Sequence, residues 1–200
     1  MASGRGKKKQ VAVFIDGSNF YFKMKSLVPH KMDLIRYRYH DLMKAFLNQD
    51  ETISYIGYYI GVVRDDGKHK RNQKAQTLRR HQQQLFAQLS KQKVEVVRGY
   101  LLERDDRFFE KGVDVRLAVD IVTMAFEKKY DTAFVVSSDT DLIPAMQKAQ
   151  SYKKEIVHIG FEHQPSLALI RYATRSRLIT RGDAEKFVAK PFKIRRFDEN

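Results

Sequence analysis

Residues 135–144, VVSSDTDLIP, begin as an apolar run and then turn acidic, with Asp139 and Asp141 directly behind the run. The segment VAVFIDGSNF at 11–20 has the same arrangement, with Asp16 immediately after its apolar residues. Short apolar runs bounded in this way predict buried strands of a parallel sheet. Ligands of such sheets bind outside the carboxyl ends of the strands, at the point where the strand order reverses. If the two strands are neighbours, Asp16, Asp139 and Asp141 therefore converge at one rim of the sheet.

The rest of the chain alternates β-rich runs with helical patterns. Strands are predicted at 11–15, 53–63, 94–102, 133–137 and 156–160, with a short one at 177–180. Helices are predicted near 18–26, 40–49, 70–92, 113–129, 141–152, 166–174 and 183–189. This alternation predicts an α/β fold with a central, mainly parallel sheet covered by helices. Because the chain has no internal repeat and no Ser/Gly linker, we expect one domain over 11–185, with a basic disordered tail at 1–10 and a basic C-terminal tail at 186–200.

The composition favours a soluble protein with a polyanionic partner. The 200 residues suit one domain, and the absence of cysteine excludes disulfides and thiolate metal sites. The N-terminus lacks the apolar segment of a secretory signal, and no apolar run approaches the roughly 20 residues of a membrane helix, so we expect a cytoplasmic protein without a membrane partner. The formal net charge is +14, and about half of it remains without the tails, which favours nucleic acid as the partner.

The most basic internal stretch, residues 64–93, has a helical pattern. Leu78, Leu85 and Leu89 lie on one stripe, at spacings of seven and four residues. The other faces carry cationic side chains that are candidate RNA-binding residues: Lys68, Lys70, Arg71, Lys74, Arg79 and Arg80. The same pattern is typical of a solvated amphipathic helix and of a surface that contacts phosphates, and the sequence leaves both interpretations open.

A fourth acidic residue follows from a long helical pattern within residues 110–130. Gly112 precedes this pattern, so Asp114 falls in the first helical turn, at the end of the fold where the strands have their carboxyl termini. Asp120 lies six residues further on, about 120° around the helix, and shares a stripe with Leu117. We therefore expect Asp114 to reach a ligand and Asp120 to have a packing or supporting role.

Each aspartate also has a simpler interpretation, because Asp is a favoured residue at helix N-caps and in turns. Taken together, however, several carboxylates at matching ends of separate elements would repel one another. Two like charges about 5 Å apart repel by roughly 3 kcal/mol at an effective dielectric constant of 20. A hard divalent cation relieves this repulsion, and ligands that are all oxygen atoms suit Mg²⁺ or Mn²⁺.

Three segments, VFIDGSNFY, KGVDVRLAVDIV and YDTAFVVSSDTDLIPAMQKA, resemble in order and spacing the NYN domain of the LabA-like branch of the PIN-like nuclease superfamily. The likeness covers roughly residues 11–160. It implies a Rossmann-like three-layer sandwich with a central, mainly parallel sheet in which the two strands are neighbours. It also implies a metal-dependent ribonuclease site in which the catalytic and metal-binding residues are Asp16, Asp114, Asp139 and Asp141.

The resemblance also suggests supporting residues and shows two departures. Asn19 would lie near the site as a polar helper, and Ser137 and Asp120 are further supporting candidates. The glycine and the aromatic residue of the family's SGDSDF-type motif are replaced here by Ser138 and Leu142. Neither change removes a carboxylate, so they bear on loop shape and substrate fit and not on metal binding.

Other chemistries find less support. The six histidines show no zinc-protease spacing, and His158, within an apolar strand, is more typical of a core residue than of a ligand. No glycine-rich nucleotide-binding motif is present. FIDGS lacks the second aspartate of a haloacid-dehalogenase motif, and a Toprim-type paired acid would need an upstream glutamate motif that the chain lacks. Phe108 and Phe109, flanked by charge, are suited either to packing or to stacking on bases.

The hypothesis is therefore a Mg²⁺- or Mn²⁺-dependent endoribonuclease that acts on single-stranded or structured RNA. The alternative, from a different class, is an RNA-binding or regulatory protein that retains the fold without significant catalysis. Metal-dependent cleavage of RNA that is abolished in Asp16→Asn would distinguish the two.

Overall fold

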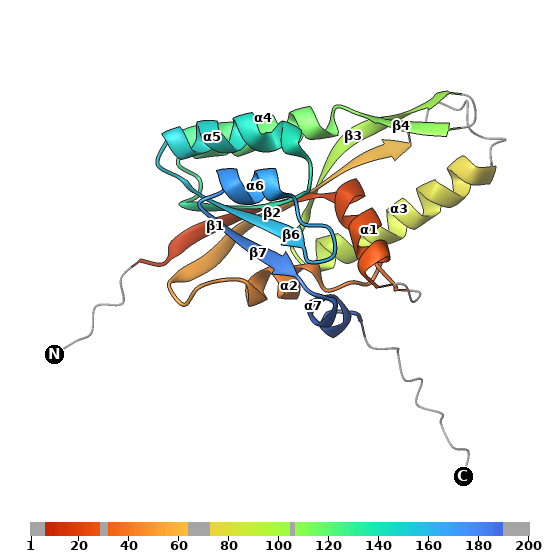
Figure 1. Ribbon diagram of the computed structural model, residues 1–200. Coiled ribbons are helices and arrows are strands. Elements are labelled where there is room, and N and C mark those ends of the chain that lie inside the picture. The colour runs from red at the N-terminus through yellow and green to blue at the C-terminus, as the bar shows by residue number, and fades with distance from the viewer. Residues whose placement is uncertain (1–6, 29–31, 64–72, 105–106, 190–200) are drawn as a thin grey trace, which may run out of the picture.

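The computed structural model describes most of the chain, and Figure 1 shows the arrangement of its elements. The described residues are 7–28, 32–63, 73–104 and 107–189. Three of the predicted RNA-binding residues, Lys68, Lys70 and Arg71, lie outside these ranges. None of the helices in the described part is long and apolar enough to cross a membrane.

The described strands form one seven-stranded sheet in the order β4-β3-β2-β1-β5-β6-β7 (Figure 1). Their bounds are β1 Lys9–Asp16, β2 Glu51–Val63, β3 Glu95–Arg104, β4 Arg107–Lys111, β5 Thr132–Val136, β6 Glu155–Phe161 and β7 Arg175–Ile179. All neighbouring strands pair in parallel except β4, which is antiparallel to β3. The chain builds from β1 outward to β4, then returns to the other side of β1 with β5. The strand order therefore reverses between β1 and β5, which confirms that these two strands are neighbours.

Helices cover both faces of the sheet. Their bounds are α1 Gly17–Leu27, α2 Tyr39–Ala45, α3 Gln73–Lys91, α4 Val113–Phe126, α5 Ile143–Ser151, α6 Leu167–Tyr172 and α7 Arg181–Lys186, with a 3₁₀ turn η1 at Thr140–Leu142. Buried residues of α1, α2, α3 and α7 contribute to one apolar core, and those of α4, α5 and α6 contribute to a second core. The result is a mixed but mainly parallel α/β sandwich of three layers, which confirms the predicted fold class.

The apolar run of β1 is explained by burial on both faces. Val13 and Ile15 point into the first core, whereas Ala12 and Phe14 point into the second. All four are fully buried, so the strand has no polar face. The same explanation holds for β5, and Ile15 lies directly opposite Val136 at the carboxyl ends of the paired strands. The next residue of β1 is Asp16, so the polar residues begin at the carboxyl end of the strand, directly after the residues that belong to the two cores.

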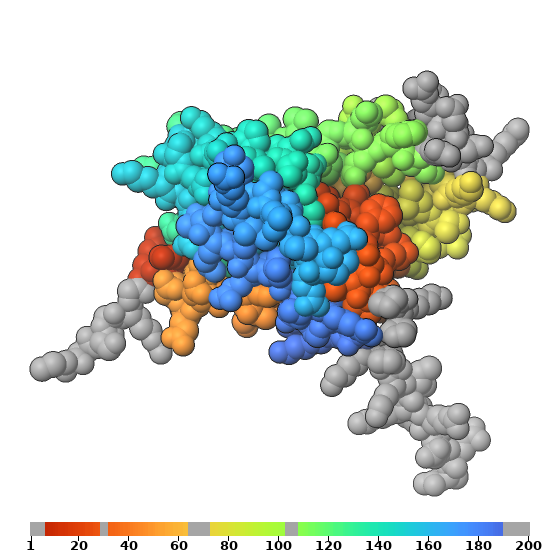
Figure 2. All heavy atoms as spheres, in the orientation of Figure 1, coloured from red at the N-terminus to blue at the C-terminus, as the bar shows by residue number. Residues whose placement is uncertain are grey.

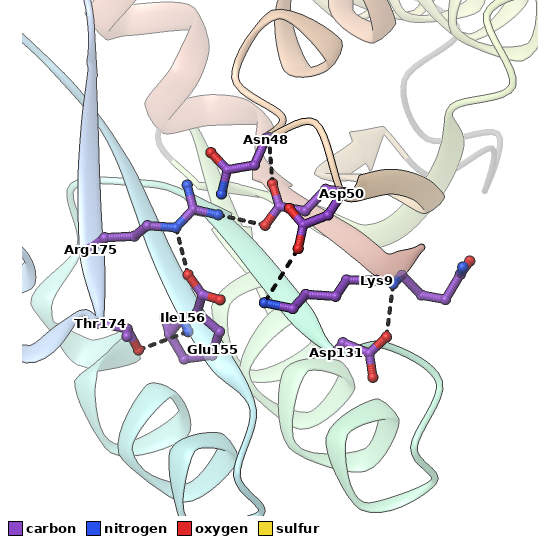
Figure 3. Close-up of polar contacts among 10 residues, drawn as sticks. Lys9, Asn48, Asp50, Asp131, Glu155, Ile156, Thr174 and Arg175 are labelled. Carbon is purple, nitrogen blue, oxygen red and sulfur yellow. Dashed lines mark hydrogen bonds and ion pairs between the residues drawn. The ribbon is translucent and has the colours of Figure 1, made fainter. Parts of the chain in front are cut away.

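Three acidic residues at the opposite, amino-terminal end of the sheet, Asp50, Glu51 and Glu155, are paired with cations (Figure 3). Arg175 of β7 contacts the buried carboxylate of Glu51 at 2.6 Å and that of Glu155 at 2.5 Å. Lys9 pairs with Asp50 at 3.7 Å on the surface. These contacts connect the first residues of β1, β2, β6 and β7, so they serve to hold the strands in register. Among the described residues, the aspartates that follow the carboxyl ends of β1 and β5 form no comparable ion pairs.

Candidate active site

Asp16 is the last residue of β1 and caps the N-terminus of α1. Its Oδ1 accepts a hydrogen bond from the backbone N–H of Asn19 at 3.0 Å, and its Oδ2 accepts one from the hydroxyl of Ser137 at 2.9 Å. Only 5% of the residue is exposed. Burial raises the pKa of Asp16 from 3.8 to about 6, and the negative charges of Asp114 and Glu110 act in the same direction.

The turn that follows β5 is fixed to β1, α1 and β6 by hydrogen bonds through Ser137 and Asn19. The hydroxyl of Ser137 accepts from the N–H of Asp139 at 3.1 Å, and its carbonyl lies 3.0 Å from Nε2 of His158. Asn19 Oδ1 accepts from the N–H of Ser138 at 3.1 Å. Because a carbonyl only accepts, His158 must carry its proton on Nε2. Two of the three predicted supporting residues, Asn19 and Ser137, therefore position the turn, and His158 does so from within the core.

Asp139 presents the next carboxylate of the site. It caps the 3₁₀ turn η1, and its Oδ1 accepts from the N–H of Asp141 at 2.9 Å. Asp141 itself is exposed in the first turn of η1. Asp16 and Asp139 are thus both helix caps, as the simpler interpretation of the sequence holds, but this local role leaves their shared position at the carboxyl ends of β1 and β5 unchanged.

Asp114 enters the site from α4. The helix begins after Gly112, whose φ of 78° lies in the left-handed region that glycine adopts most readily, and Asp114 falls in the first turn. Burial raises the pKa of Asp114, and the charges of Asp139, Glu110 and Asp141 raise it further. The aspartates predicted from the sequence therefore lie within electrostatic reach of one another, as does an additional glutamate.

That glutamate, Glu110, was missed by the sequence patterns. It lies in β4, and its Oε2 accepts a 2.6 Å hydrogen bond from the hydroxyl of Ser18, while its Oε1 accepts from the N–H of Gly61. β1 ends at Asp16, opposite Tyr59, so Gly61 of β2 lies beyond the reach of β1 pairing. Glu110 supplies the missing acceptor and at the same time brings a carboxylate to the first turn of α1. Its place four residues before Asp114 was the available sequence signal.

Asp120 has different partners from Asp114. Its Oδ2 accepts from the hydroxyl of Tyr59 at 3.0 Å, and both of its oxygens lie 2.9 Å from Nε of Arg116. Asp120 therefore has contacts different from those of the other acidic residues, as helix geometry predicts from its position about 120° around the helix from Asp114. Its contacts tie α4 to β2, which is a packing function.

The donor chemistry of the site suits a hard divalent cation, because the side chains that gather there are carboxylates whose charges raise the pKa of Asp16 and Asp114. The positions of these carboxylates, however, do not form a complete set of metal ligands. Within the described residues, no group of three or more His, Asp or Glu side chains is placed to hold a metal ion. Both oxygens of Asp16 are already engaged by protein hydrogen bonds. The residues thus fit an ion that keeps part of its water shell, and not one enclosed by protein ligands.

The predicted basic helix is present as α3, and its apolar stripe faces the sheet. Leu89 is fully buried and Leu85 packs against the same core. Of the predicted RNA-binding residues in this helix, Lys74 and Arg80 are exposed, whereas Arg79 is half-buried, on the side of the helix that carries Ala75 and Gln82. The helix therefore has cationic side chains on its surface. This is compatible both with a solvated amphipathic helix and with a surface that contacts phosphates.

A mainly parallel α/β sandwich with carboxylates where its strand order reverses is consistent with a PIN-like fold. Residues 10–179 match the family model of the NYN domain, so this chain belongs to the NYN domain family, whose members are generally nucleases.

Similarity to individual proteins is illustrated by one curated relative and one solved structure. A 57-residue stretch is 40% identical to the "Uncharacterized protein MJ0482" of Methanocaldococcus jannaschii, covering 28% of this chain and 24% of that protein, so the match spans about a quarter of the relative's length. The crystal structure of VPA0982 from Vibrio parahaemolyticus, described as a protein of unknown function, superimposes with a TM-score of 0.66 at 20% identity, covering 94% of this chain and 100% of that one. At this identity, the second likeness is one of fold.

Proposed function

We propose that this chain is a metal-dependent endoribonuclease of the LabA-like branch of the family. The observation that carries the proposal is that Asp16, Asp114 and the pair Asp139 and Asp141 come from three separate elements near the switch point of the sheet. The charges of Asp139 and Asp141 act on Asp114, and that of Asp114 acts on Asp16. The net charge of +14 supports a polyanionic substrate, and membership of a family that is generally nuclease supports phosphodiester cleavage.

We expect the exposed and the buried carboxylates to have different roles. Asp114 and Asp141 are exposed and Asp139 is half-buried, so these three face the side from which a phosphate arrives. Asp16 is buried and is fixed in orientation by Asn19 and Ser137. We expect the exposed carboxylates to hold a hydrated Mg²⁺ or Mn²⁺, which when bound supplies an activated water and offsets charge on the leaving oxygen. The products would carry 5′-phosphate and 3′-hydroxyl ends.

The surface of α3 would guide the RNA backbone. Lys74 and Arg80 are exposed on this helix, and Arg79 is half-buried. Each phosphate contact would release condensed counterions, so this part of the binding energy should weaken as the salt concentration rises.

A second candidate function is RNA binding without significant turnover. It is favoured by one observation, namely that the described carboxylates do not form a preassembled group for a metal ion. In that case the acidic end of the sheet would serve to limit how closely phosphate approaches, and the basic surfaces would carry the function.

Incubation of a labelled RNA with the purified chain in Mg²⁺, Mn²⁺ or EDTA tests the proposal. We expect cleavage with either metal, none in EDTA, and none by Asp139→Asn purified in parallel, because that change removes one of the carboxylates proposed to hold the metal ion. Binding of the same RNA should survive in the variant. Equal cleavage by both proteins would indicate a contaminating nuclease, and binding without cleavage by the natural chain would establish the second candidate.

A further inference from the structure

The outer face of α1 carries two exposed aromatic side chains. Phe22 is 68% exposed and Tyr21 is 38% exposed, whereas Phe20 and Met24 of the same helix are fully buried in the first core. The two exposed rings contact each other edge to face, with centroids 5.4 Å apart. Since the buried face already anchors the helix, packing within the described chain does not account for these two rings.

A cation accompanies the aromatic pair. The ammonium group of Lys25 lies 4.5 Å from the centroid of the Tyr21 ring. Both aromatics and Lys25 are exposed on a helix whose first turn carries no acidic residue. A surface that combines exposed rings with a positive charge is complementary to a nucleic acid strand, whose bases offer flat faces and whose backbone offers negative charge.

The pair lies beside the candidate active site. α1 begins at the cap formed by Asp16, and Ser18 in its first turn bonds to Glu110. Tyr21 and Phe22 follow Ser18 by three and four residues, about 5–6 Å along the helix axis. Figure 2 shows α1, in orange, at the surface between the blue C-terminal segments and yellow α3.

We propose that Tyr21 and Phe22 form a stacking platform for unpaired bases next to the cleavage site, so that the substrate class is RNA that is single-stranded at the bound segment. This inference rests on the proposed function and adds the substrate class to it. Base stacking on aromatic side chains tolerates any sequence, because every base has a π-face. In an RNA duplex the base faces are already stacked on each other, so the duplex would gain no binding energy from the platform.

The chain provides a closely matched control in Phe126. This residue is also 68% exposed, also lies in a helix, and also contacts one aromatic neighbour, Tyr152, at 5.8 Å between centroids. It stands at the far end of α4, twelve residues and about 18 Å of helix rise from Asp114. Phe22→Ala and Phe126→Ala therefore remove the same group from similar surroundings at different distances from the site.

The test is fluorescence anisotropy in EDTA, which prevents metal-dependent cleavage, with a short single-stranded RNA, its duplex, and the same strand containing abasic positions. We expect Phe22→Ala to bind the single strand about tenfold more weakly than the natural chain, within the range measured for one stacked base. Phe126→Ala should bind like the natural chain. Duplex binding should be unaffected by Phe22→Ala. The abasic strand should bind the natural chain and Phe22→Ala equally.

Phe22→Trp and Phe22→Leu separate stacking from general apolar contact, since tryptophan retains a π-face and leucine does not. Tryptophan should preserve affinity and leucine should behave like alanine. Equal affinities of Phe22→Ala and Phe126→Ala for the single strand would overturn the platform, as would equal losses on duplex and single strand; the exposed rings would then belong to a protein contact. If the natural chain cleaves RNA and Phe22→Ala is unchanged, only the platform is overturned, whereas failure of the natural chain to bind any RNA overturns the proposed function as well.

Discussion

Replacing Asp16 by asparagine should stabilise the metal-free protein above about pH 6. The native pKa of Asp16 is about 6, against an ordinary value of 3.8. Between these values the native state holds a proton that the unfolded chain has released, so the free energy of unfolding falls as the pH rises. One pKa unit corresponds to about 1.4 kcal/mol, so the ionised carboxylate costs the native state up to about 3 kcal/mol at neutral pH.

The asparagine side chain can keep the local geometry. Its oxygen can accept from the N–H of Asn19, and its amide can donate to the hydroxyl of Ser137, which has two lone pairs. The assay is urea unfolding in EDTA between about pH 4 and pH 8, with the difference between variant and natural chain as the measured quantity. We expect a difference near zero at about pH 4 and a variant more stable by up to about 3 kcal/mol at about pH 8. Mg²⁺ should raise the stability of both proteins, and that of Asp16→Asn by less, because the variant lacks one negative charge beside the exposed carboxylates.

A difference that does not change with pH would refute this reasoning, because it would mean that Asp16 is ionised in the native state throughout. Asp131→Asn is the control, since Asp131 is exposed at the opposite end of the sheet and accepts from the backbone of Gln10 at 2.8 Å. Removing that carboxylate should not stabilise the protein above about pH 6.

Three further outcomes are expected. Arg175→Ala should destabilise the fold by about 3–5 kcal/mol in thermal or urea unfolding, because it leaves a buried carboxylate without its cation, and RNA cleavage at permissive temperature should be unaffected. Replacing Lys74 and Arg80 by alanine should flatten the plot of log K against log salt by about 0.7 for each phosphate of a single strand that the variant no longer neutralises; an unchanged slope would identify α3 as a solvated surface. Asp114→Asn should reduce cleavage and the metal-induced rise in melting temperature together, whereas Asp120→Asn, which breaks contacts between α4 and β2, should mainly alter metal-free stability. Reversed results for the two aspartates would mean that their roles are exchanged.

The parts of the fold that the sequence predicted are those with strong local patterns. β1 and β5 are apolar at most positions because both faces are covered, and their ends are marked by Asp16 and Asp139. The prediction that β1 and β5 are neighbours depended on the family resemblance, because no local sequence pattern reports strand order. Once that order is given, the meeting of the acids at one rim follows from parallel pairing alone.

The parts that the sequence did not predict depend on contacts between distant segments. β4, with the sequence RFFEK, is a five-residue edge strand with charge at both ends, and it is held by pairing with β3 and by the contacts of Glu110 with Ser18 and Gly61. The strand and helix patterns therefore did not single out Glu110, whose partners Ser18 and Gly61 are distant in the chain. The role of His158 was hidden for a similar reason, since its partner, the carbonyl of Ser137, is 21 residues away. Phe109 of the same hairpin is 47% exposed and so does not pack in the core.

The hydroxyl of Ser137 joins the ends of the two central strands, and this has a consequence for the motions that the protein can make. Asp16 and Ser137 are buried and belong to the middle of the sheet, where local opening usually costs nearly as much as global unfolding. Amide hydrogens around them should exchange with solvent only when the whole domain unfolds. The acidic end of the sheet would then be a rigid template, and an RNA with an unfavourable backbone shape would have to bend to fit it.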